Sequence, residues 1–145
     1  MKKLSCDLLL TCDQTILSKD NKISLIGIFD QIFLPEIPSS HPKLSLVGLL
    51  SGEPYTDHHL TLKLTNYPDQ NISVNLGTTG KSNLVAEFIN LPIRTSGIYT
   101  FSLFSGKTLL AQSHLSISKL PTSPARSKVI NWISPYFNIL SFQDV

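Results

Sequence analysis

The stretch RTSGIYTFSLFSGKTLLAQSHLSIS, residues 94–118, decides the fold because two alternating apolar segments flank a short run of turn residues. One face of the first segment carries Tyr99, Phe101 and Leu103. We expect the same face of the second segment to carry Leu109, Ala111, Leu115 and Ile117. Ser105-Gly106-Lys107 lies between the two segments, so the stretch predicts a β-hairpin.

Apolar alternation continues through the chain upstream of this hairpin. The cleanest example is HHLTLKLTN, residues 58–66, in which Leu60, Leu62 and Leu64 are predicted to face inward. The other predicted strands cover residues 4–12, 23–33, 44–50, 72–76 and 84–91. About eight short strands with turn signals between them predict an all-β protein, a two-sheet antiparallel β-sandwich.

Two of these strands, residues 23–33 and 44–50, carry apolar side chains on both faces. An antiparallel sheet that exposes one face to water is normally polar on that face. We therefore expect part of this chain or a partner to cover the second face.

The first strand is expected to place Cys6 and Cys12 on one face, together with Leu4, Leu8 and Leu10. Residues six apart on a strand lie ~20 Å apart, so the two thiols are not expected to bridge each other or share a metal.

The chain changes character after Leu120, where Pro121 and Pro124 mark a boundary. We divide it into a sandwich domain, residues 1–120, and a C-terminal tail, residues 121–145. The tail sequence KVINWISPYFNIL favours a short helical or irregular segment that Pro135 interrupts. Its predicted role is to pack on the sandwich or on a partner through Trp132, Ile133, Tyr136 and Phe137.

Composition and charge argue against partners that are nucleic acids or membranes. The chain has 145 residues and a formal net charge of +2, too small for the basic footprint that nucleic acids or anionic lipids attract. No apolar run reaches the ~18 residues of a membrane span. MKKLSCDLLLTC, residues 1–12, lacks the cleavage site of an export signal, so we expect a cytoplasmic protein with reduced cysteines.

The stretch GTTGKS, residues 77–82, resembles the end of a phosphate-binding loop, G-x-x-x-x-G-K-[ST]. Asn75 occupies the position of the first glycine, and no repeated strand–helix–strand unit surrounds the stretch. We interpret it as a polar hairpin turn and predict no nucleotide or other cofactor.

Taken with residues 7–50, SGIYTFSLFSGKTLLAQSHLSI (residues 96–117) resembles a bacterial family of small proteins that have no assigned activity. The resemblance covers roughly residues 3–118 and is most specific at FLPEIPSSHPKLSLV, residues 33–47. The closing hairpin, with its Gly97-x-Tyr99-x-Phe101 run, is similar to that of immunoglobulin-like sandwiches. The resemblance implies an immunoglobulin-like β-sandwich and no activity, and the tail lies outside it.

The sequence favours a non-catalytic protein-interaction or assembly module over an enzyme. Its partner would be a second copy of the chain or another protein. The alternative is a small-molecule-binding protein or a hydrolase, with a site in the loops formed by His41, Asp57, His58 and His59. No metal site is predicted, because adjacent His58 and His59 point to opposite faces of a strand.

Overall fold

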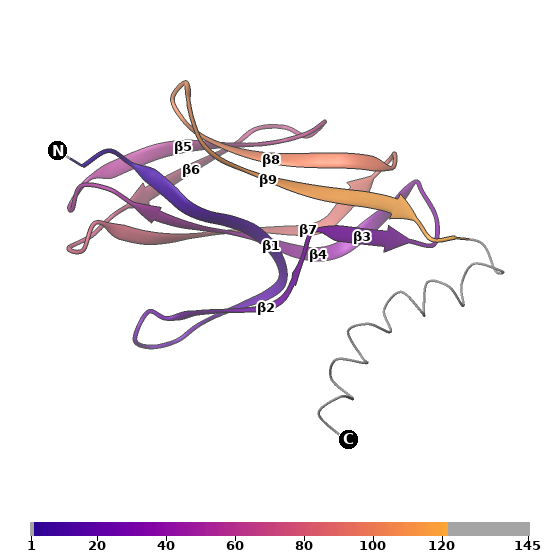
Figure 1. Cartoon of the computed structure of the whole chain (residues 1–145), viewed down its shortest axis with the longest axis horizontal. Helices are drawn as coiled ribbons and strands as arrows, with labels where there is room; N and C mark the ends of the chain where they lie inside the picture. Colours follow the sequence, from indigo (N-terminus) through magenta and orange to yellow (C-terminus); the bar gives the residue numbers. More distant parts are fainter. Residues whose placement is uncertain (1, 122–145) are drawn as a thin grey trace, which may run out of the picture.

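The computed structural model describes residues 2–121 of the chain. The tail residues Trp132, Ile133, Tyr136 and Phe137 lie outside the described residues. Within residues 2–121 the alternating segments form nine strands in two facing sheets (Figure 1). Sheet I has the order β2 (Ile23–Phe29), β1 (Ser5–Leu17), β4 (Ser39–Ser51), β7 (Lys81–Ile93). Sheet II has the order β3 (Gln31–Leu34), β9 (Thr108–Lys119), β8 (Gly97–Ser105), β5 (Asp57–Leu64), β6 (Gln70–Asn75).

The strand order is that of an immunoglobulin-like sandwich. In such domains the first, second and fifth strands share one sheet, and the third, sixth and seventh share the other. Here β1, β4 and β7 take the places of the first, second and fifth strands and share sheet I. β5, β8 and β9 take the places of the third, sixth and seventh strands and share sheet II. All pairings are antiparallel except that of β3 with β9, which is parallel. The predicted all-β immunoglobulin-like sandwich is therefore confirmed.

The core lies between the two sheets and consists of the inward side chains of both. Leu60, Leu62 and Leu64 of β5 are buried in it, as the sequence predicts. From the facing layers, the rings of Phe88 and Phe101 meet edge to face with their centroids 5.5 Å apart. Such pairs contribute roughly 0.5–1.5 kcal/mol beyond the area that they bury.

Tyr99 fixes the corner between β7 and β8. Its side chain is buried, and its hydroxyl donates a 2.7 Å hydrogen bond to the carbonyl oxygen of Thr95. A tyrosine that bonds back to the backbone a few residues upstream is typical of this corner in immunoglobulin-like sandwiches.

The predicted strand at residues 23–33 is wrong as a single element. The chain bends at Asp30, so β2 lies in sheet I and β3 lies in sheet II. The carbonyl oxygen of Asp30 accepts a 2.9 Å hydrogen bond from the backbone N–H of Ser116 in β9. The apolar pattern is continuous across the bend because both segments need inward side chains.

Cys6 and Cys12 do not share a face, contrary to the sequence prediction. The register between β1 and β4 shifts between Cys6 and Leu8, which is a β-bulge. One extra residue reverses the alternation. Leu4 and Cys6 therefore pack toward the core, whereas Leu8 and Cys12 lie on the outer face of sheet I.

The pairing of β8 with β9 contains another bulge, between Leu103 and Phe104, and it also reverses the alternation of inward and outward side chains. Leu109 is exposed instead of facing inward, and its neighbour Leu110 packs against the core.

β4 begins at Ser39, earlier than the predicted Leu44, and includes Pro42 of the proline-rich segment. Residues 39–43 pair with β7, while the pairing of β4 with β1 covers only residues 45–51. Proline is tolerated at such a place because one side of the strand has no ladder to which it must donate.

GTTGKS forms a turn, as predicted, but not a hairpin. It connects β6 of sheet II to β7 of sheet I, and it leads into a strand rather than the helix that a phosphate loop requires. Gly77 and Gly80 have positive φ angles of 61° and 72°. The carbonyl oxygens of Gly77 and Gly80 accept 2.8 Å hydrogen bonds from the N–H groups of Tyr55 and Gly52, so the two crossings between the sheets are joined.

We expect Gly80→Ala to destabilise the protein by about 3 kcal/mol and Gly77→Ala by about 1 kcal/mol. Alanine at either position is strained, because a residue with a Cβ atom rarely adopts a positive φ angle. At position 80 the new Cβ would also clash with the carbonyl oxygen of Gly52, whereas no atom lies within 4 Å at position 77. Urea unfolding of both variants measures the difference. Equal losses of stability would show that the contact with Gly52 relaxes freely.

Tyr99→Phe should cost about 1–2 kcal/mol, because the carbonyl oxygen of Thr95 loses its donor at a partly buried site. Tyr55→Phe is the matched control, since Tyr55 is 73% exposed. Thermal unfolding should separate the two variants. A Tyr99→Phe variant as stable as the control would show that the hydrogen bond from Tyr99 to Thr95 does not stabilise the fold.

Candidate functional site

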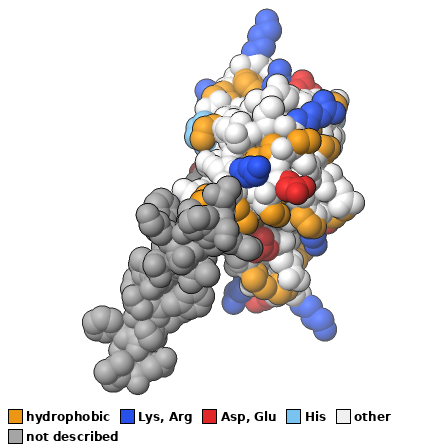
Figure 2. Space-filling model, turned by 90° about the vertical axis from the view of Figure 1, so that its right-hand side faces the viewer, with side chains coloured by type: hydrophobic (Ala, Val, Ile, Leu, Met, Phe, Trp, Pro, Cys, Tyr) orange, Lys and Arg blue, Asp and Glu red, His pale blue; other side chains and the backbone are white. Residues whose placement is uncertain are grey.

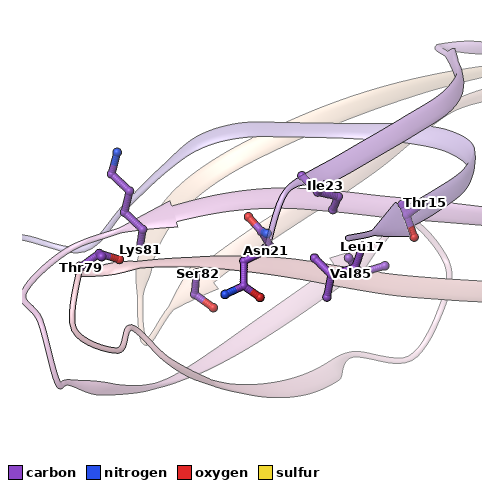
Figure 3. Close-up of a pocket in the computed structure, with 9 residues that line it drawn as sticks. Thr15, Leu17, Asn21, Ile23, Thr79, Lys81, Ser82 and Val85 are labelled. Carbon is purple, nitrogen blue, oxygen red and sulfur yellow. The ribbon is translucent and has the colours of Figure 1, made fainter. Parts of the chain in front are cut away.

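An open cleft of about 650 Å³ lies between the β1–β2 hairpin and the beginning of β7 (Figure 3). β1 pairs with β4 only as far as Cys12, and from there its last residues pair with β2 alone. Freed from β4, this hairpin projects from the sandwich (Figure 1). One wall of the cleft is the tip of the hairpin, and the other is the GTTGKS turn with the first residues of β7.

The hairpin wall is held by a tight polar turn. Ser18 and Lys22 exchange hydrogen bonds across the turn, including one of 2.9 Å from the Ser18 N–H to the Lys22 carbonyl oxygen. Asn21 adopts a positive φ of 63°, which asparagine tolerates better than most residues. Four side chains of the hairpin line the cleft: Thr15, Leu17, Asn21 and Ile23.

The β7 wall contributes polar groups from an edge strand. Its lining residues are Thr79, Lys81, Ser82, Asn83 and Val85. In Figure 3 the Lys81 side chain points away from the other labelled residues. Among residues 2–121, Lys81 takes part in none of the ion pairs.

The chemistry of this lining suits binding better than catalysis. Hydroxyl, amide and aliphatic groups predominate, and the described residues that line the cleft include no histidine, cysteine, aspartate or glutamate. General acid–base catalysis needs a group that titrates near the working pH, and among residues 2–121 Lys81 is the only ionisable group in the lining. The cleft therefore offers hydrogen bonds and apolar contact without a proton-transfer pair.

The second candidate surface is the outer face of sheet I, which is apolar along several adjacent strands. Register pairs place Leu10, Val47 and Val85 in one row across the sheet, and Cys12 lies next to Ile28. Val47 and Cys12 are fully buried. The exposed large aliphatic side chains on this face are Leu8, Ile28, Val85 and Ile89. The expectation of apolar residues on both faces of these strands is met, and water reaches much of the outer one.

The four residues of the alternative site do not converge. His41 pairs with Leu91 near the start of β4, roughly 33 Å along the strand from Ser51 at its end. Its Nε2 atom is buried without a hydrogen-bond partner among the described residues, and its ring lies 6.0 Å from that of Phe29. Asp57 begins β5, beyond the far end of β4.

The three residues at the start of β5 make local contacts. Asp57 accepts a 2.7 Å hydrogen bond from Asn75, His58 Nε2 lies 2.9 Å from the Thr56 hydroxyl, and His59 Nδ1 lies 3.1 Å from the Ser73 hydroxyl. The contacts of Asp57 and His59 join β5 to β6, whereas His58 contacts the loop residue two positions before it. The structure brings Asp57 and His58 near each other, but it separates both from His41.

Sequence reasoning missed the cleft although it singled out part of its wall. GTTGKS drew attention as a phosphate loop, and three of its residues, Thr79, Lys81 and Ser82, line the cleft. The opposite wall depends on the point at which β1 leaves β4, which apolar alternation does not encode. The four-residue polar turn at 19–22 marked a hairpin without indicating which surface its tip would face.

Metal-binding clusters and membrane-spanning helices are both absent from residues 2–121. Among residues 2–121, no group of three or more histidine, cysteine, aspartate or glutamate side chains is placed to hold a metal ion. The described part of the chain contains no helix with the length and apolar character that a membrane span requires. On the described part of the face in Figure 2, basic and acidic side chains are interspersed with hydrophobic ones.

Comparison with known proteins gives a family and a fold. Residues 7–118 match a family of unknown function (DUF6941). No curated protein matches the sequence. An immunoglobulin-like protein from Pseudomonas aeruginosa has 16% identity and a TM-score of 0.46, covering 79% of this chain and 96% of that one. The β-glucosidase of Listeria innocua, alone and with isofagomine, has 6% identity and a TM-score of 0.44, covering 81% of this chain and 16% of that one.

Both thiols should react slowly with a thiol reagent in the folded protein. Burial raises the pKa of Cys6 and of Cys12, so the protonated form predominates at neutral pH. Because the folded pKa lies above the unfolded one, the associated stability is complete below the unfolded pKa of about 8.5 and declines as pH rises through the folded value. Reagent kinetics with and without urea at pH 7, and unfolding at pH 7 and 10, measure both effects. A fast reaction of either thiol in the folded protein at pH 7 would contradict this expectation.

Proposed function

Because this chain belongs to a family of unknown function (DUF6941), its membership supplies no activity, and we propose that the protein is a non-catalytic interaction or assembly module. The observation that carries the proposal is the apolar outer face of sheet I. Ile28 and Ile89 on this face are each 61% exposed. Exposed aliphatic side chains gathered on one face of a sheet are typical of a protein–protein contact.

The hydroxyl, amide and aliphatic groups that the described residues place in the cleft support the non-catalytic part of the proposal. The partner is a second copy or another protein. Residues 121–145 belong to the proposal as a separate tail, with Trp132, Ile133, Tyr136 and Phe137 as aromatic and aliphatic anchors that cover this face or engage the partner. Free Cys6 and Cys12 support a cytoplasmic location, where thiols remain reduced.

Binding of a small polar molecule is the second candidate function, and the 650 Å³ cleft is the observation that favours it. Hydrolysis around His41 and His58 has less support, because these two residues lie at opposite ends of β4 and its following loop.

The test is site-specific photocrosslinking of the full chain in its own host cells. A photoreactive residue replaces Ile28 or Ile89 on the outer face of sheet I, and a control replaces Gln112, which is exposed on sheet II. We expect adducts from positions 28 and 89 but not from 112, since an interaction face holds its partner within reach. The mass of the adduct shows whether the partner is a second copy. No adduct at 28 and 89, or equal labelling at all three positions, would contradict the proposal.

A further inference from the structure

β7 is the edge of the described sandwich best suited to accept another strand. It pairs with β4 on one side only and contains 13 residues. The other edge strands are shorter: β3 has 4 residues, β6 has 6 and β2 has 7 with Gly27 at a φ of 69°. Short or bent edges discourage pairing, whereas a long regular edge presents a row of unpaired N–H and C=O groups.

The first half of β7 carries two opposite charges at a self-complementary spacing. Lys81 and Glu87 point to the outer face of sheet I, where their register partners are Ser51 and Ser45. Glu87 forms one 3.7 Å ion pair with Lys43, and both side chains are about half exposed. The exposed carboxylate of Glu87 can accept a further cation.

We propose that the partner is a second copy of this chain, which adds its β7 antiparallel to the β7 edge with Leu84 at the two-fold axis. This inference rests on the proposed function and specifies its partner. Residues 81–87 then pair with the same residues of the second copy. Lys81 lies opposite Glu87 of the second copy, and this pair occurs twice.

Other registers that keep the two outer faces on one side are less favourable. An axis at Val85 places Lys81 opposite Ile89. An axis at Glu87 places two carboxylates opposite each other, which destabilises a pair of strands. The charges therefore select the register, while backbone hydrogen bonds and apolar burial supply the affinity.

The cleft is compatible with this arrangement. Pairing ends at Lys81 because the chain turns away at Gly80. Ile89 of the second copy then lies beyond Lys81, beside the cleft that Leu17 and Ile23 line. Leu17 is 64% exposed in the single chain, so contact with Ile89 of the second copy would remove two exposed aliphatic side chains from water.

The experiment is sedimentation of the full chain over a range of concentrations, with three charge variants. We expect a concentration-dependent dimer for the unmodified protein. Lys81→Glu and Glu87→Lys should each weaken dimerisation by about tenfold or more, because each creates two like-charge pairs. The double variant Lys81→Glu/Glu87→Lys exchanges the two charges and should restore the dimer to within about threefold of the unmodified protein.

Two controls isolate the effect. Lys63→Glu makes the same change of net charge on sheet II, and Lys43→Gln removes the internal partner of Glu87. Neither should alter dimerisation. Hydrogen exchange should show that amides of residues 81–87 become protected as concentration rises.

A monomer at every concentration would overturn self-pairing, while the photocrosslinking at Ile28 and Ile89 would still decide whether the protein is an interaction module. A dimer indifferent to the single charge reversals, or a double variant that stays monomeric, would overturn the β7 register.

Discussion

Burial of apolar side chains between the two sheets is the constraint on which the rest of this structure depends. Each strand must present alternate residues inward, and the buried set reaches from Leu44 and Leu46 of β4 to Phe101 and Leu103 of β8. The bulges in β1 and β9 change which side chains meet this requirement: Leu9 and Leu110 pack against the core, whereas Leu8 and Leu109 lie outside it. The two crossings tied together at Gly52 and Gly80 keep the sheets in place at one end.

Exposed apolar side chains occur on the outer sides of both sheets. In sheet II, β5 alternates between buried leucines and polar residues such as Thr61 and Lys63, whereas Ile98 of β8 and Phe33 of β3 are 60% and 45% exposed. In sheet I the outer positions include Val47, Val85 and Ile28. Stability alone does not require these residues where they are exposed. Exposed apolar side chains next to a free edge strand are what strand-adding interactions use.

The cleft and the outer face have a common origin in the path of β1. While β1 pairs with β4 it belongs to the sheet, and after Cys12 it belongs only to its hairpin with β2. The separation opens the space in front of Lys81 and Asn83. The β7 edge is open for a different reason: it lies on the side of the sheet away from β1, and no strand among residues 2–121 pairs with its outer side.

The sequence by itself determined the class of fold, the inward positions of β5 and β8, including Tyr99, and the turn at GTTGKS. These features are local, because alternation, turn residues and the spacing from Gly97 to Phe101 depend on neighbours along the chain. The division of residues 23–33 between two sheets, the opposite faces of Cys6 and Cys12, and the cleft were decided only by tertiary structure. The physical reason is that a period of two residues specifies which side chains face the core but not which strand lies alongside. A single bulge or bend therefore changes the face or the sheet without changing the pattern of residues.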